Sequence, residues 1–253
     1  MRVRVWGVVF GWLVLAGSLS AQQTDAFSRK NTWTMFAEYS NTSSHILMGS
    51  VRQRKIADLG GAYTRRVVRF WRSDLSYHVE VRPVMFESDP LTIETGTAVI
   101  TSGPNTGTTS TSTNSVVPIA KCEPYHETGT IPAEPPNFPS ETYTITGTCG
   151  RQWTFAQAFS PLGFKYSMRT RHPVQPFIVG TLGYMYASRP IPIANAEAFN
   201  FIFNFGAGVE VFRSKRRSVS LECRFNHFSN NSTAPANPGA DNVMFKTSYS
   251  FGR

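Results

Sequence analysis

Beyond its first twenty or so residues, the sequence lacks any apolar run long enough for a membrane-spanning helix. A chain crosses a bilayer either as helices of about 20 apolar residues or as a closed β-barrel. If the mature protein sits in a membrane, it must therefore do so as a barrel. Cysteine is also scarce, with 3 in 253 residues, and no Cys/His spacing resembles a zinc site. We expect neither a metal nor another cofactor.

Acidic residues are fewer than basic ones, 16 against 25, which leaves a formal net charge of +9. An excess of basic residues favours an anionic partner such as lipid phosphates, although it can also serve solubility alone. The N-terminus has the form of a secretory signal peptide. Arg2 and Arg4 precede the apolar run Val5–Leu15, and small residues follow up to Ala21. We expect residues 1–21 to be removed, residues 22–253 to form one domain, and no contact with nucleic acid.

Residues 88–151 differ in composition from the rest of the chain. They contain the run Thr106–Thr113, in which every residue but one is Thr or Ser, and the proline-rich stretch Pro132–Pro136. Such a segment buries little apolar surface, so we expect a long polar loop inserted into the domain. Export allows disulfides. The economical pairing joins Cys122 to Cys149 and leaves Cys223 as a free, buried thiol.

The remaining sequence alternates between apolar and polar residues, as β-strands do. Phe199, Phe201, Phe203 and Phe205 share one face of their segment, and the last strand, Val243–Phe251, repeats the pattern. The predicted strands lie within 31–51, 59–68, 75–86, 163–169, 176–188, 199–212, 218–229 and 243–251. A soluble β-sandwich would also alternate. Aromatic faces opposite Gly, Asn and Glu favour instead an all-β, eight-stranded antiparallel outer-membrane barrel with apolar residues outside.

Two polar residues interrupt the outer row of the seventh predicted strand. Val219, Leu221, Phe225, His227 and Ser229 all fall on the apolar face of this strand. Asp241 opens the next strand, twelve residues after Ser229. Ser, His and a carboxylate are the components of a hydrolytic triad, which is defined by geometry and not by order in the chain. Long loops mark the external side of such barrels, so we expect the three residues at the outer rim.

The last third of the chain resembles the lipid A 3-O-deacylases and related acyloxyacyl-hydrolase-like barrels. Gln175-Pro176-Phe177, Phe205–Val209, Arg224, His227–Asn230 and Asn237-Pro238-Gly239 carry the resemblance. It implies an eight-stranded barrel that removes an ester-linked acyl chain from lipid A. His227 would be the base, Ser229 the nucleophile and Asp241 the acid, where the best-known members have Glu.

Further site residues complete this prediction. Asn230, with Asn231 and Ser232, would stabilise the oxyanion, and the acyl chain would lie along Val219, Leu221 and Phe225. The expected partners are lipopolysaccharide and other outer-membrane lipids, with a homodimer left open. The main alternative is a non-enzymatic barrel whose Thr/Ser-rich segment serves adhesion or masking. A small pore is a third reading, but the interior of an eight-stranded barrel is filled by side chains.

Overall fold

The computed structural model of the protein describes residues 27–134 and 138–253, so the predicted signal peptide lies outside the described residues. Within them, no helix is long and apolar enough to cross a membrane. The chain forms strands β1 to β10. Their bounds are β1 Asn31–Ser40, β2 Lys55–Phe70, β3 Ser73–Ile100, β4 Thr109–Val116, β5 Tyr125–Ile131, β6 Glu141–Met168, β7 Val174–Ile191, β8 Glu197–Ser214, β9 Arg217–Ser229 and β10 Ala240–Gly252.

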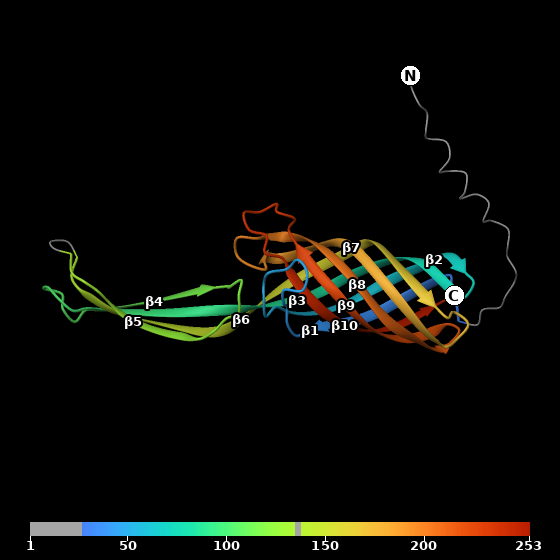
Figure 1. Cartoon of the computed structure of the whole chain (residues 1–253), viewed down its shortest axis with the longest axis horizontal. Helices are drawn as coiled ribbons and strands as arrows, with labels where there is room; N and C mark the ends of the chain where they lie inside the picture. The colour runs from blue at the N-terminus through green and yellow to red at the C-terminus, as the bar shows by residue number, and fades with distance from the viewer. Residues whose placement is uncertain (1–26, 135–137) are drawn as a thin grey trace, which may run out of the picture.

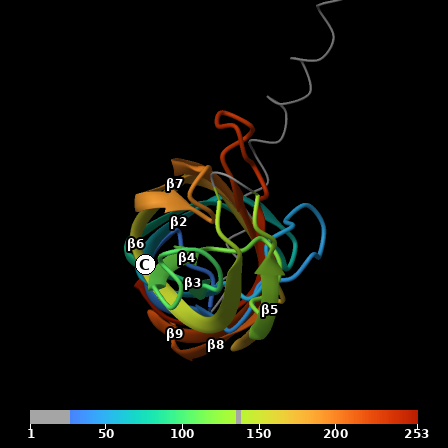
Figure 2. The same ribbon diagram turned by 90° about the vertical axis from the view of Figure 1, so that its left-hand side faces the viewer.

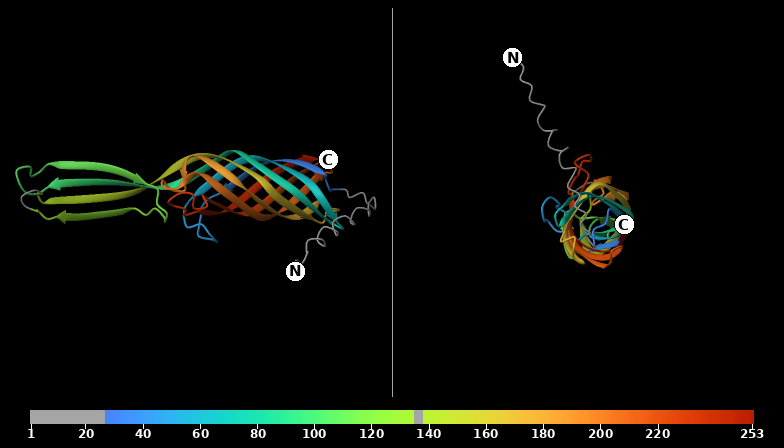
Figure 3. Two further views of the ribbon diagram at one scale, coloured as in Figure 1. Left: turned by 90° about the horizontal axis from the view of Figure 1, so that it is seen from above. Right: turned by 90° about the vertical axis from the view of Figure 1, so that its right-hand side faces the viewer.

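Eight of these strands close into an antiparallel barrel, as predicted. Neighbours pair in the order β3-β2-β1-β10-β9-β8-β7-β6, and β3 pairs with β6 to complete the ring. The right-hand panel of Figure 3 looks along this barrel. In the ring, the β9–β10 pair stands diametrically opposite the β3–β6 pair. All eight strands lean across the barrel axis, which Figure 1 shows from the side.

The two faces of the barrel wall follow the alternation in the sequence. On β8, Phe199, Phe201 and Phe205 are exposed on the outside, whereas Asn200 and Asn204 are fully buried in the lumen. Charged groups fill the centre of the lumen, where they pair across strands. Residues Glu38, Glu80, Arg82, Glu222, Arg224 and Lys246 form this network, and Nη1 of Arg224 lies 2.9 Å from Oε2 of Glu80. Charged side chains that fill the centre of the lumen argue against a pore.

Residues 88–151 were predicted to form a polar loop, and this prediction is wrong because most of these residues form strands. β3 and β6 are each 28 residues long and continue past the barrel as a pair. β4 pairs with the far part of β3, and β5 pairs with the far part of β6. Figures 1 and 3 show this four-stranded extension projecting from one end of the barrel, and Figure 2 views it end-on. Threonine has high β-propensity, so a Thr-rich polar segment can pair without an apolar core.

The long connections meet at the barrel end that carries the extension, as the loop lengths predicted. Segments 41–54, 192–196 and 230–239 lie there, and short turns close the opposite end (Figure 1). We refer to these ends as the outer and periplasmic rims. The first strand lies within the predicted segment 31–51, where β1 stops at Ser40 and residues 41–54 form an ordered loop over the outer rim. The short strand predicted at 163–169 is only the end of β6.

Candidate active site

His227 and Asp241 face each other directly across the β9–β10 pair. The register aligns Asp241 with His227, two residues before β9 ends and one residue after β10 begins. Nδ1 of His227 donates to Oδ1 of Asp241 at 2.6 Å. The aspartate, although one methylene shorter than glutamate, therefore reaches the histidine. This hydrogen bond fixes the tautomer and leaves Nε2 of His227 as the nitrogen able to accept a proton.

The loop after β1 binds the other carboxylate oxygen of Asp241 through the backbone of residues 46–48, which we call the Asp241 seat. Oδ2 accepts the backbone N–H groups of Ile46, Leu47 and Met48, at 3.3, 2.7 and 2.9 Å. The carboxylate has no solvent exposure, so these donors replace its hydration. Three backbone donors hold the carboxylate charged and in one orientation. These donors could not be predicted from the sequence, because backbone N–H groups carry no residue signature.

Two backbone features hold the loop over Asp241. The main-chain N–H of Ser44 donates to the carbonyl of Asp241 at 3.1 Å, and that of Ser50 donates to Pro238 at 2.7 Å. Gly49 lies against the first turn of β10, where a Cβ atom would come within 2.5 Å of the Asp241 nitrogen. Nδ1 of His45 is 2.7 Å from the Gly49 carbonyl. The side chain of His45 therefore supports this loop.

Ser229 ends β9 on the same outward row as His227. It is half-buried and aligned with Phe201 of β8. Among the described residues, its hydroxyl has no hydrogen-bond partner. Catalytic hydrogen bonds in unliganded enzymes are often long and tighten only with substrate, so the unbonded hydroxyl does not exclude Ser229 as a reacting group.

The loop after β9 is organised by Asn230, and this bears on the predicted oxyanion donors. The Asn230 side chain donates to the Ala236 carbonyl at 2.8 Å and accepts the N–H of Ser232 at 3.0 Å. Its own N–H donates to Asn237 at 3.1 Å. Two of the three predicted donor groups are therefore engaged within the loop. Within the described residues, no partner accepts the N–H of Asn231, which has a left-handed φ of 52°.

The row below the triad residues faces outward, as predicted. Val219 and Leu221 are 43% and 69% exposed, and Phe225 is half-buried. Cys223 is also exposed, so its prediction as a buried thiol is wrong, because the apolar face is the outer one. Small side chains there leave an outer hollow of about 680 Å³ between β1, β8, β9 and β10, lined by Leu221, Cys223 and Phe245 among others.

The predicted disulfide is present, with Cys122 bonded to Cys149. It lies at the base of the extension. Cys149 is on β6, and Cys122 is on the connection between β4 and β5. The bond ties this connection to the part of β6 that leaves the barrel.

Comparison with known proteins supports the predicted resemblance. The sequence model of the lipid A 3-O-deacylase (PagL) family matches residues 133–250, which is just under half of the chain and includes β6 to β9 and most of β10. The crystal structure of the outer membrane enzyme PagL is 12% identical, and the alignment covers 87% of this chain and 99% of that one, with a TM-score of 0.49. Neisserial surface protein A is 8% identical, covering 88% and 97%, with a TM-score of 0.38. Among curated protein sequences, none matches the chain.

Proposed function

We propose that the protein is an outer-membrane lipid A deacylase that cleaves an acyl ester with Ser229 as nucleophile, His227 as general base and Asp241 as the orienting carboxylate. The observation that carries the proposal is the 2.6 Å bond from His227 to an aspartate held by three backbone donors. A purely structural histidine on a lipid-facing strand has no need of a buried, oriented carboxylate. The pair is the arrangement that gives a serine on the same face a base of fixed tautomer.

In the proposed reaction, Nε2 of His227 takes the proton from Oγ of Ser229 as Oγ attacks the ester carbonyl carbon. The tetrahedral intermediate collapses when the bond to the sugar oxygen breaks, and His227 returns the proton to that oxygen. This leaves an acyl-serine and a free sugar hydroxyl. Water then attacks the acyl-serine with His227 again as base, which releases the fatty acid and restores Ser229. Asp241 stays ionised and stabilises the imidazolium in both halves.

The oxyanion needs hydrogen-bond donors next to Ser229. We assign this role first to the N–H of Asn231, since those of Asn230 and Ser232 are engaged in the loop. Asn230 then acts as a positioning residue, because its side chain bridges Ser232 and Ala236 and so shapes the turn that carries Asn231. Direct donation by Asn230 or Ser232, the original prediction, would require these bonds to open when substrate binds.

The substrate would arrive laterally, through the membrane. His227 and Ser229 lie on the outer face of the wall, on the strand whose lower part faces lipid. An acyl chain lying along Phe225, Leu221 and Val219 would remain in an apolar environment from ester to methyl end. The hollow beside Leu221 and Phe245 offers room on this path.

Lipid A mass spectrometry is the direct test. Expression of the protein in a host with full-length lipid A should lower the lipid A mass by one hydroxyacyl chain, and Ser229→Ala should abolish the change. If both proteins left lipid A intact, the non-enzymatic barrel with an adhesive or masking extension would be the better reading. If Ser229→Ala remained fully active, the nucleophile would have to be another residue.

Lipopolysaccharide is thus the proposed substrate partner, with lipid A as the part that is cleaved. A homodimer stays a proposal as well. Cross-linking in outer membranes, followed by electrophoresis without boiling, tests it.

A further inference from the structure

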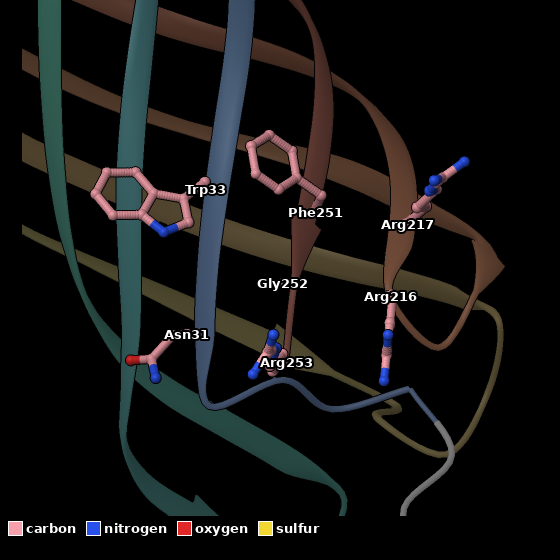
Figure 4. Close-up of a pocket in the computed structure, with 7 residues that line it drawn as sticks. All are labelled: Asn31, Trp33, Arg216, Arg217, Phe251, Gly252 and Arg253. Atoms are coloured by element: carbon pink, nitrogen blue, oxygen red, sulfur yellow. The ribbon is translucent and has the colours of Figure 1, made fainter.

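A second outward hollow lies at the periplasmic rim, at the end of the barrel opposite the triad. It measures about 360 Å³ and is lined by Asn31, Trp33, Arg216, Arg217, Phe251, Gly252 and Arg253. Figure 4 shows Trp33 and Phe251 side by side on the wall, with Arg253 and Arg216 below them and Arg217 farther along the rim. The reaction proposed above makes no use of these residues.

The aromatic side chains form one level across neighbouring strands. The register aligns Trp33 of β1 with Tyr63 of β2 on one side and with Phe251 of β10 on the other. The rings of Trp33 and Tyr63 are 4.8 Å apart, and Trp33 and Phe251 are 56% and 43% exposed on the outer wall. Such an aromatic girdle marks the boundary between acyl chains and headgroups.

The arginines lie at or beyond this level, on the side away from the membrane core. Arg217 is aligned with Phe251, whereas Arg216 and Arg253 lie one or two residues farther out. All three are exposed, and within the described residues their guanidinium groups have neither a hydrogen-bond acceptor nor an acidic partner. Cations at the headgroup level, next to an aromatic girdle, face lipid phosphates.

The backbone fixes the positions from which two of these arginines extend. The N–H of Gly252 donates to the carbonyl of Arg216 at 3.0 Å, which joins the end of β10 to the turn before β9. The main-chain oxygen of Arg253 accepts the N–H groups of Lys30 and Asn31, at 2.7 and 2.9 Å. A Cβ atom at Gly252 would come within 2.0 Å of the Asn31 carbonyl, so β1 and β10 approach closely only because this residue is glycine.

From this geometry we infer that the hollow binds the headgroup phosphate of an anionic glycerophospholipid from the periplasmic leaflet. Guanidinium groups of Arg216 and Arg253 would hold the phosphate oxygens, since arginine donates paired N–H groups to phosphate. Trp33 and Phe251 would contact the glycerol esters and upper acyl chain. An anionic headgroup is favoured over a zwitterionic one because the hollow contains three cations and no carboxylate side chain. This site does not depend on the deacylase chemistry.

Native mass spectrometry of the full-length protein in mild detergent tests the inference. Phosphatidylglycerol, phosphatidylethanolamine and glycerol phosphate would each be added to the wild type and to the double variant Arg216→Gln/Arg253→Gln. We expect a retained phosphatidylglycerol on the wild type and binding roughly thirtyfold weaker on the double variant, since each interfacial arginine contributes about a factor of five. Lys215→Gln is the matched control, because Lys215 lies in the same turn but does not line the hollow.

Three results would overturn the inference. Equal retention of phosphatidylglycerol by the wild type and the double variant would remove the arginines from the site. Equal retention of phosphatidylethanolamine would remove the requirement for net negative charge. Displacement of the lipid by glycerol phosphate at equal concentration would show a simple anion site. Unboiled electrophoresis of each variant checks that its barrel is folded, so that lost binding cannot be ascribed to unfolding.

Discussion

The barrel part of β3 and the part of β3 in the extension show how one continuous strand adapts to two surroundings. Between Ser73 and Glu87, buried polar residues such as His78 and Glu80 alternate with outward apolar ones such as Val81 and Phe86. Beyond Leu91 the strand mixes Thr, Gly and Glu with small or aliphatic residues, and no residue on either face is fully buried. The partner strand β4 is exposed at every position.

The difference between the two parts comes from what surrounds each face. In the barrel, the outer face meets lipid and the inner face meets a closed polar lumen, so alternation is required. The extension is enclosed neither by lipid nor by a lumen, so polar residues can occupy both of its faces. Hydrogen bonding to β4 and β6 holds this part of β3 in place of a core. The proposed triad belongs to the first environment, so we expect that the second can be altered without affecting it.

We expect the largest effect on deacylation from a substitution at the outer rim of the barrel. Ser229→Ala should lower deacylation by roughly 10³-fold or more, because the nucleophile is lost while the barrel is unchanged. Ser220→Ala is the matched control on the same strand, since Ser220 faces the lumen and bonds Ser248. Release of fatty acid from purified lipid A measures both. Equal losses in the two variants would mean that β9 is merely sensitive to substitution.

A smaller loss is expected from the orienting carboxylate. Asp241→Ala should lower turnover by roughly 10²- to 10⁴-fold, because His227 then loses its fixed tautomer. Asp241→Glu should also lower turnover, despite the family's usual glutamate, because a longer side chain would displace the carboxylate from the N–H groups of residues 46–48. A silent Asp241→Ala would show that another group orients the histidine.

The seat of Asp241 can be tested through its backbone. Leu47→Pro removes the donor that lies 2.7 Å from Oδ2, whereas Leu47→Ala shortens an exposed side chain and keeps the donor. We expect the proline variant to lose about tenfold in turnover, consistent with one charge-assisted hydrogen bond, and the alanine variant to lose little. Steady-state rates on the two proteins, with unboiled electrophoresis as the folding check, give the comparison. Similar rates would show that the loop does not position Asp241.

The smallest effect on activity is expected from the extension. Cys122→Ser with Cys149→Ser removes the disulfide and should destabilise the extension by about 3 kcal/mol on a chain-entropy estimate, with deacylation unchanged. Hydrogen exchange should rise in β4 and β5 but not in β8 to β10. A drop in activity of the kind expected for the rim variants would contradict the separation of the two regions.

Much of the barrel could be predicted from the sequence, because period-2 alternation records which face each residue takes. Phe199 to Phe205 and Val243 to Phe251 identified their strands in this way. The site row on β9 was predictable for the same reason, and its geometry brings His227 to Asp241. The extension was missed because strands exposed on both faces do not alternate. The Asp241 seat was missed because backbone donors from residues 46–48 look alike in any sequence.

The position of the extension in the ring has a consequence for traffic in the outer leaflet. It continues from β3 and β6, diametrically opposite β9 and β10, and its strands reach roughly 40 Å beyond the barrel. Because no strand of the extension continues from β9 or β10, we expect the extension to change in length or surface without altering the path by which a lipid would approach His227 and Ser229.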